Sequence, residues 1–348
     1  MIETLNSIIP YISGLWTLPW ILIGLIITPF LSRVFGSNKI DNTMEKIGLI
    51  LLYIFVPLLL FRIFLDVDFG ENELIFSIFC FLIIGLMYIL AYLLAKLNAN
   101  KINLKDSSKR HYIKTVLTNQ GRSSAFVGSA MLAISEWQIP AAINMSISAI
   151  FLFSIIPYIL SHTYKKDRIS EIHVLPWYLK LFPWYLISFA LTSVILHGTT
   201  GLYLNDFGDT GIIFKFFTTI TIPVALYYVG ASIHPRDLKI NEMKKLFNLS
   251  HKIRDHWLWV RSIFLITIVI TPIIFSLFLS ILLFLDFITK EWFAILIINS
   301  ILPITSTNMF LVPYGIDKKA TALSITWTTI VCVPIVVLLI TIFRKYLI

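Results

Sequence analysis

The sequence predicts an all-α membrane protein with ten transmembrane helices in two inverted five-helix repeats, in which helices four and nine are broken. Three observations lead to this prediction: an apolar composition, ten apolar segments joined by loops of alternating charge, and a polar interruption at the matching place in each half. The 348 residues are 57% hydrophobic and 14% charged, and their mean hydropathy is +0.85. These values lie far outside the range of soluble domains, so a lipid bilayer is the first expected partner. In this setting the formal net charge of +9 does not indicate nucleic acid as a partner.

Ten segments are long and apolar enough to cross a bilayer. They are residues 15–35, 45–65, 74–97, 111–134, 139–161, 176–198, 212–233, 256–284, 291–314 and 318–343. Lysine and arginine gather in the loops after the odd-numbered segments, whereas Asp66, Glu71, Glu136 and Asp206 follow even-numbered ones. Because basic loops tend to stay in the cytoplasm, the alternation predicts a multi-pass protein of the plasma (inner) membrane with both termini outside the cytoplasm.

Short proline motifs recur five segments apart. Val56-Pro57 in the second segment matches Ile222-Pro223 in the seventh, and Ile156-Pro157 in the fifth matches Val333-Pro334 in the tenth. An odd number of spans reverses the orientation of the unit, so the two repeats would be antiparallel across the membrane. We therefore expect a first repeat at residues 1–161, a cytoplasmic linker at 162–175 and a second repeat at 176–348.

The fourth and ninth segments are both interrupted near the middle. Pro303 removes a backbone donor and is followed by polar residues before apolar character returns. In the fourth segment a polar run begins at Thr118 and ends at Ser124, where Gly121 is expected to supply backbone freedom. Freed backbone groups must be satisfied within hydrocarbon, so such breaks are tolerated only inside a bundle or beside a wet cavity. Two breaks at matching positions point to a transporter's binding site near the bilayer midplane.

The two breaks carry groups that suit an anion. Each second half-helix would begin with unpaired N–H groups and a positive dipole, and Arg122 adds a full charge whose planar fork fits a carboxylate. The alternative is that the polar residues only satisfy the broken backbone and that Arg122 snorkels to an interface. The predicted substrate-binding residues are Asn119, Gln120, Gly121, Arg122, Ser123, Ser124, Pro303, Thr305, Ser306, Thr307 and Asn308, and further residues that could line the cavity are Tyr227, Ser232 and Asn144.

Acidic residues do not occur in the middle of any predicted span. This favours uniport, or coupling through neutral ligands such as Asn119 and Thr305, although backbone carbonyls at broken helices can also hold sodium. Arg62 lies four residues before Asp66 on one helical face, so we expect an interfacial ion pair between them. The two cysteines lie in apolar runs without metal-ligand spacing, and we expect no metal and no cofactor.

Several motifs resemble the auxin efflux carrier family, which includes bacterial malonate and malate permeases and plant PIN-type auxin carriers. The run from Leu302 to Asn308 (LPITSTN), followed by YGID at 314–317, is similar to that family's broken-helix signature, and Pro57, Asn119-x-Gly121 and GASI at 230–233 resemble further family motifs. The resemblance implies that the broken helices four and nine cross, and that access alternates between a support part (spans 1, 2, 6 and 7) and a transport or crossover part (spans 3, 4, 5, 8, 9 and 10). Arg122 departs from the family pattern, so a substrate is not carried over from any relative.

These observations together predict a secondary transporter that moves a small organic anion, either a carboxylate or a dicarboxylate, and that is not an enzyme. One alternative is a receptor or scaffold that uses the same fold without transport. Another is a membrane-embedded acyltransferase, but such an enzyme needs an intramembrane base, and the first histidine, His111, lies at the edge of a predicted span. The expected partners are the organic anion and the bilayer, and a homodimer is left open.

Overall fold

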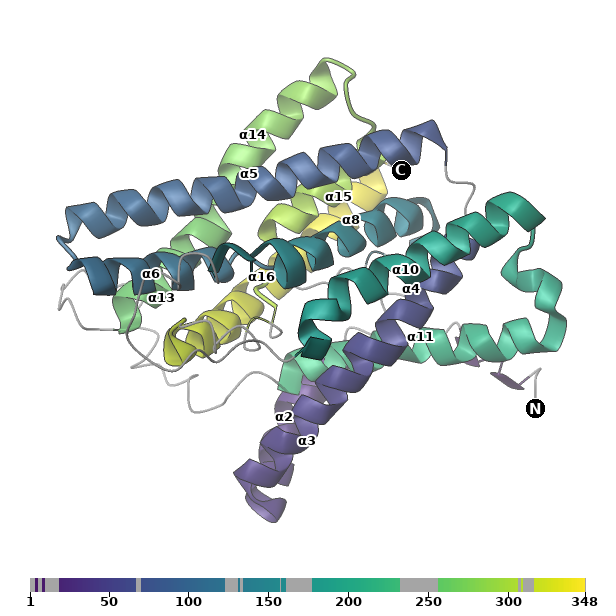
Figure 1. Cartoon of the computed structure of the whole chain (residues 1–348), viewed down its shortest axis with the longest axis horizontal. Helices are drawn as coiled ribbons and strands as arrows, with labels where there is room; N and C mark the ends of the chain where they lie inside the picture. Colours follow the sequence, from purple (N-terminus) through teal and green to yellow (C-terminus); the bar gives the residue numbers. More distant parts are fainter. Residues whose placement is uncertain are drawn as a thin grey trace. The chain divides into compact units, whose positions relative to one another are not determined.

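A computed structural model describes residues 4–5, 8–9, 19–66, 70–122, 131, 134–156, 158–160, 177–231, 256–305, 308 and 316–347. Within these residues the chain is almost entirely helical, and its β pairing is limited to one isolated bridge between Arg122 and Ile304. The chain forms two compact units. Each unit is described by itself below, and Figure 1 gives the helix labels. The predicted linker 162–175 lies outside the described residues.

Four helices are long and apolar enough to cross a membrane. They are Ser37–Leu65, Glu71–Lys101, Trp257–Phe284 and Lys319–Tyr346, and the pair Ile187–Thr200 and Leu204–Thr221, bent by 84°, makes a fifth if it is counted as one span. The structure therefore confirms a helical chain with four to five candidate membrane spans in its described part. Helical residues also fall within each of the ten predicted segments, but ten spans and the inverted repeat stay predictions.

The first unit comprises Met1–Phe79, Ser124–Ile147 and Leu181–Ser232. Its main helices are α2 (Pro19–Phe35), α3 (Ser37–Ile50), η2 (Leu51–Phe55), α4 (Val56–Leu65), α10 (Trp177–Thr200), η6 (Leu204–Phe207) and α11 (Gly208–Ala231). Helix α2 packs closely on α11 because Gly24 has no side chain: a Cβ there would lie 2.2 Å from the Tyr227 carbonyl oxygen. The Tyr227 hydroxyl and Thr28 Oγ1, 3.1 Å apart, join the same two helices.

Arg62 joins α4 to α11 in the first unit. Its Nη1 donates to the Lys215 carbonyl (3.1 Å) and to the hydroxyls of Thr218 (2.9 Å) and Thr219 (2.8 Å). The Asp66 carboxylate instead accepts a hydrogen bond from the Leu204 backbone N–H at 2.8 Å. The predicted direct ion pair is therefore not formed, because α11 satisfies the guanidinium and the start of η6 satisfies the carboxylate, although Asp66 still interacts electrostatically with Arg62.

The second unit comprises Cys80–Ser123, Ser148–Lys180 and Ile233–Ile348. Its helices include most of α5 (Glu71–Lys101), the end of α8 (Gln138–Ile150), α6 (Asp106–Thr118), η5 (Phe151–Ile155), α13 (His256–Leu265), η8 (Ile266–Ile270), α14 (Thr271–Phe284), α15 (Lys290–Ile301) and α16 (Lys318–Tyr346). Three alanines at four-residue spacing on α5 let its neighbours approach closely. The cluster around them is Ala91, Ala95, Ala99, Leu104, Tyr112, Val116, Ile263, Ile266, Ile304 and Ile325.

Helices α5 and α14 each expose one apolar face. On α14, Ile273, Leu277, Ile281 and Phe284 recur every three or four residues and are all exposed. This spacing places them along one side of the helix. Such a face would be costly in water, whereas contact with lipid tails accommodates it.

The described helices contain three π-helical stretches, η2, η5 and η8. In the sequence, each ends two residues before a proline, namely Pro57, Pro157 and Pro272. A proline lacks the N–H of a regular helical turn and crowds the carbonyl four residues earlier, and a wider turn relieves this conflict. Pro223 and Pro334, the sequence partners of Pro57 and Pro157, lie inside the α-helices α11 and α16. The motif at Pro57 and its partner at Pro223 therefore do not share local helix geometry, and Pro157 lies outside the described residues.

Candidate functional site

Both predicted breaks interrupt the α-helix in the residues that the structure describes, although Thr118 is still the last residue of α6 and Asn308 lies in a 3-10 turn. Helix α6 ends at Thr118, after which Asn119 to Arg122 leave the helical path. Helix α15 ends at Ile301, and Leu302 turns to an extended conformation (φ −56°, ψ 148°) directly before Pro303. The residue before a proline is sterically biased towards this conformation, which explains where α15 stops.

The two breaks meet within the second unit. Arg122 and Ile304 form an antiparallel bridge, and the Thr305 N–H donates to the Gly121 carbonyl at 3.0 Å. These contacts satisfy part of the backbone that each interruption frees. Segments about 180 residues apart in the sequence thus lie together, as the sequence analysis expected for a shared site.

Gly121 is required for this contact because a larger side chain would not fit, and not because the backbone needs the conformational freedom of glycine. A Cβ at this position would lie 2.7 Å from Asn308 Oδ1 and 2.9 Å from Leu152 Cδ1. Its φ angle is not in the left-handed region that favours glycine. The expectation that Gly121 supplies conformational freedom is therefore corrected: the missing side chain lets the first break approach Asn308 of the second.

A row of hydroxyls on α16 holds both breaks. Asn119 Nδ2 donates to Thr321 Oγ1 at 3.0 Å, and also to the Thr115 carbonyl at 2.8 Å. The Ile304 N–H donates to Thr328 Oγ1 at 3.2 Å. Thr321, Ser324 and Thr328 are spaced by three and four residues and so lie on one helical face. This face was not predicted from the sequence, although hydroxyls at helical spacing inside an apolar span can be recognised there.

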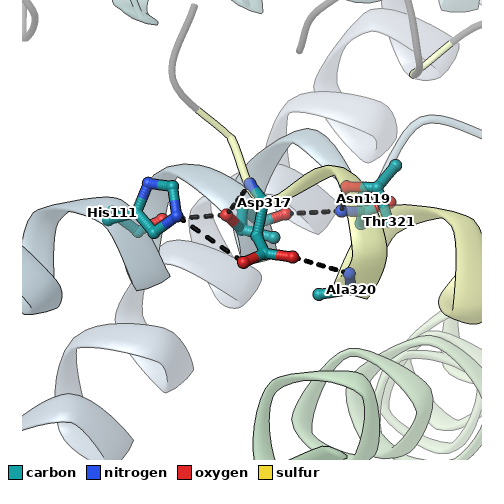
Figure 2. A network of polar contacts seen from close by, with 6 residues as sticks. His111, Asn119, Asp317, Ala320 and Thr321 are labelled. Atoms are coloured by element: carbon teal, nitrogen blue, oxygen red, sulfur yellow. Dashed lines mark hydrogen bonds and ion pairs between the residues drawn. The ribbon is translucent and has the colours of Figure 1, made fainter. Parts of the chain in front are cut away.

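Asp317 fixes the start of α16 against α6 (Figure 2). Its Oδ1 caps the helix by accepting from the Ala320 N–H at 2.7 Å, and its own N–H donates to Thr115 Oγ1 at 3.0 Å. Its Oδ2 lies 3.8 Å from His111 Nε2, which gives an ion pair when the histidine is protonated. Asp317 therefore has a positioning role, because it places the hydroxyl face of α16 next to Asn119.

The Arg122 side chain is buried, with 5% of its surface exposed, and none of its three guanidinium nitrogens has a hydrogen-bond partner among the residues that the structure describes. It lies close enough to Tyr88 of α5 and Cys332 of α16 for electrostatic interaction. The Tyr88 ring stacks on Phe151, with centroids 5.6 Å apart and an interplanar angle of 6°. A guanidinium buried inside the protein does not fit the snorkelling alternative, in which it would reach water, and a buried cation without a partner is costly.

Other buried polar groups at the breaks also have unmet hydrogen-bonding capacity. Asn308 is 0% exposed, and neither its Nδ2 nor its Oδ1 has a hydrogen-bond partner among the described residues. The amide nitrogens of Asn119 and Gln120 bond to carbonyls of α6, as the backbone-satisfaction alternative expects, but their oxygens are unpartnered. Because buried polar groups are normally satisfied, a set of this kind indicates a place for a polar ligand.

The structure brings together some of the predicted site residues. Those that meet in the second unit are Asn119, Gln120, Gly121, Arg122, Pro303, Thr305 and Asn308. Tyr227 and Asn144 lie in the first unit, where Tyr227 faces α2 through Thr28. The remaining predictions, Ser123, Ser124, Ser306, Thr307 and Ser232, lie outside the described residues. Four further residues lie near the breaks and were not predicted, namely Tyr88, Phe151, Leu152 and Cys332. Their side chains carry no charge and do not stand out from the apolar segments that contain them.

Groups of three or more His, Cys, Asp or Glu that could hold a metal ion are not found among the residues described. The chain matches no family model, and the comparison with curated proteins gives no significant match. The site is therefore interpreted from its own geometry.

Proposed function

We propose that this chain is a secondary transporter that carries a small organic anion, a carboxylate or dicarboxylate, across the plasma membrane by alternating access. The anion would bind where the two broken helices meet. The observation that carries the proposal is the buried guanidinium of Arg122, which has no partner in the described part of the chain although it lies beside two interrupted helices. A carboxylate would supply the bidentate acceptor that this group lacks.

The energetics also support an anion as the ligand. An arginine at bilayer depth costs at least about 2.5–3.5 kcal/mol, and it is usually kept there by a function. An inside-negative membrane potential favours outward movement of an anion by about 2.3 kcal/mol per charge at 100 mV. The LPITSTN and YGID motifs resemble those of auxin efflux carriers, which supports an organic anion as the substrate. The predicted topology, with both termini outside, agrees with the ten spans that this resemblance implies.

The test is flux of labelled dicarboxylates and aromatic carboxylates into liposomes that contain the purified protein. We expect uptake of at least one of these anions, and we expect Asn308→Ala to reduce it at least tenfold. The stability of this variant should be close to wild type, because the Asn308 side chain makes no hydrogen bond within the described structure. A suitable control is Arg344→Gln, since Arg344 is exposed near the end of α16.

Two outcomes would contradict the transporter proposal. Binding of an anion without flux would favour the receptor or scaffold alternative. If none of the tested anions binds or is transported, the proposed anion site is contradicted as well. Full flux in Asn308→Ala would show that the second break does not contribute to the substrate site.

A further inference from the structure

Ser324 lies between the two points at which α16 holds the broken helices. Thr321, three residues earlier, accepts from Asn119, and Thr328, four residues later, accepts from the Ile304 N–H. A helix rises about 1.5 Å per residue, so Ser324 is about 4.5 Å along the axis from Thr321 and about 6 Å from Thr328. Its three- and four-residue spacing places Ser324 on the helical face that contacts Asn119, the residue that follows α6.

Four neutral oxygens, one on Ser324 and three at the end of α6, are buried and have no hydrogen-bond partner. Within the described part of the chain they are Ser324 Oγ, Asn119 Oδ1, Thr118 Oγ1 and Gln120 Oε1, on residues that are 0%, 0%, 0% and 1% exposed. Three of them belong to the C-terminal end of α6, where the helix dipole is negative and main-chain carbonyls are left without helical partners. Oxygens and a negative dipole together suit a cation.

We infer that a monovalent cation of the sodium class binds between the end of α6 and Ser324 of α16. The four oxygens carry no formal charge, whereas calcium and magnesium sites rely on carboxylates. Neutral side-chain oxygens and unwound carbonyls at a broken helix are a known way to coordinate sodium. The cation site stands on this geometry alone, and only its role as a coupling ion rests on the proposed function.

The cation site and Arg122 are distinct subsites along α16. Arg122 lies near Cys332, which follows Ser324 by eight residues, or about 12 Å of helix. At this separation and an effective dielectric constant of about 20, repulsion between two positive charges weakens binding about tenfold. An anion at Arg122 would cancel this repulsion. The cation and the anion should therefore bind cooperatively, each raising the affinity of the other by the same factor.

Thermal unfolding of the purified full chain tests this inference without any flux measurement. At constant ionic strength, replacing N-methyl-D-glucamine chloride by sodium chloride should raise the Tm in a saturable way. Ser324→Ala should abolish this shift. Thr326→Val is the matched control and should retain it: the Thr326 hydroxyl is also buried and unpartnered, but it lies on the other side of α16. In these chloride salts, without an added carboxylate, Arg122→Gln should bind sodium about tenfold more tightly than wild type.

An equal Tm in the two salts for the wild-type protein would overturn the inference, and so would a full sodium shift in Ser324→Ala. Loss of the shift in Arg122→Gln would contradict two separate subsites. The two proposals can fail independently. A shift that depends on Ser324 in a protein that transports no anion leaves the cation site intact, whereas anion flux without any sodium shift overturns the cation site alone.

Discussion

At the scale of single residues, Gly121 decides whether the two breaks can touch. Its Cα faces Asn308 Oδ1 and Leu152 Cδ1 so closely that even a methyl group would lie within 3 Å of both. Neither neighbour can withdraw without cost, because Asn308 is itself fully buried. The hydrogen bond from Thr305 to the Gly121 carbonyl depends on the same close approach.

Gly121→Ala should therefore destabilise the protein by about 1–3 kcal/mol, which is the usual cost of overpacking a buried position. Gly198→Ala is the control, because a Cβ at Gly198 meets nothing within 4 Å and the residue lies in helix α10. Alanine is favoured over glycine in a helix, so this variant should be as stable as wild type or more stable. Equal effects of the two substitutions on the Tm would contradict the packing role of Gly121.

The residues that could be predicted from the sequence are those that stand out chemically from their span. Arg122, Asn119 and Asn308 are polar residues in apolar segments, and all three are buried where the breaks meet. Tyr88 and Cys332 were not found, because an uncharged residue inside a span looks the same whether it packs against lipid, protein or a site. The correct role of Gly121 also depends on a contact between distant segments.

At the scale of helices, α16 organises the site. Thr328 supplies the partner of the Ile304 N–H, a backbone donor that the interruption after α15 would otherwise leave buried and unsatisfied. Thr329, the next residue, donates only to the Ile325 carbonyl of its own helix. Two adjacent threonines therefore differ in whether they hold the break.

Thr328→Val should lower the stability by about 1–3 kcal/mol, which is the cost of leaving a buried donor unpaired. Thr329→Val removes a hydroxyl of the same kind from the same helix without touching the break, so its effect should be much smaller. The comparison is made by thermal unfolding of the two purified variants. If Thr329→Val lowers the stability as much as Thr328→Val does, the hydrogen bond between Thr328 and the Ile304 N–H makes no specific contribution to stability.

The ends of α6 and α15 could be predicted because proline, glycine and polar residues interrupt apolar runs at those points. The hydroxyl face of α16 is equally visible in the sequence at three- and four-residue spacing, but its meaning depends on which helix it faces. The π turns before Pro57 and Pro272 show a further limit. Similar proline motifs give a continuous helix at Pro223 and Pro334, because the surrounding packing decides how each proline is accommodated.

At the scale of the whole molecule, the orientation in the membrane follows from loop charge rather than from the fold. The sequence predicts cytoplasmic loops after odd-numbered spans and extracytoplasmic loops after even-numbered ones. Ser107 lies in a predicted cytoplasmic stretch and Asn205 in a predicted extracytoplasmic one, and both residues are exposed. The native cysteines, Cys80 and Cys332, are both buried.

A membrane-impermeant maleimide should label Asn205→Cys on intact cells, whereas Ser107→Cys should react only after the cells are permeabilised. The wild-type protein is the control, and its two buried cysteines should react slowly under both conditions. Labelling of Ser107→Cys on intact cells, with protection of Asn205→Cys, would reverse the predicted orientation.

The most direct test of the anion site is calorimetric binding of a carboxylate and of its neutral carboxamide analogue to wild type and to Arg122→Gln. We predict that the substitution weakens carboxylate binding by about 10- to 100-fold, because a charged hydrogen bond of about 1.5–3 kcal/mol is lost. Binding of the carboxamide should change by much less. Equal losses for the two ligands, or no loss for either, would contradict a site in which Arg122 holds the negative charge of the substrate.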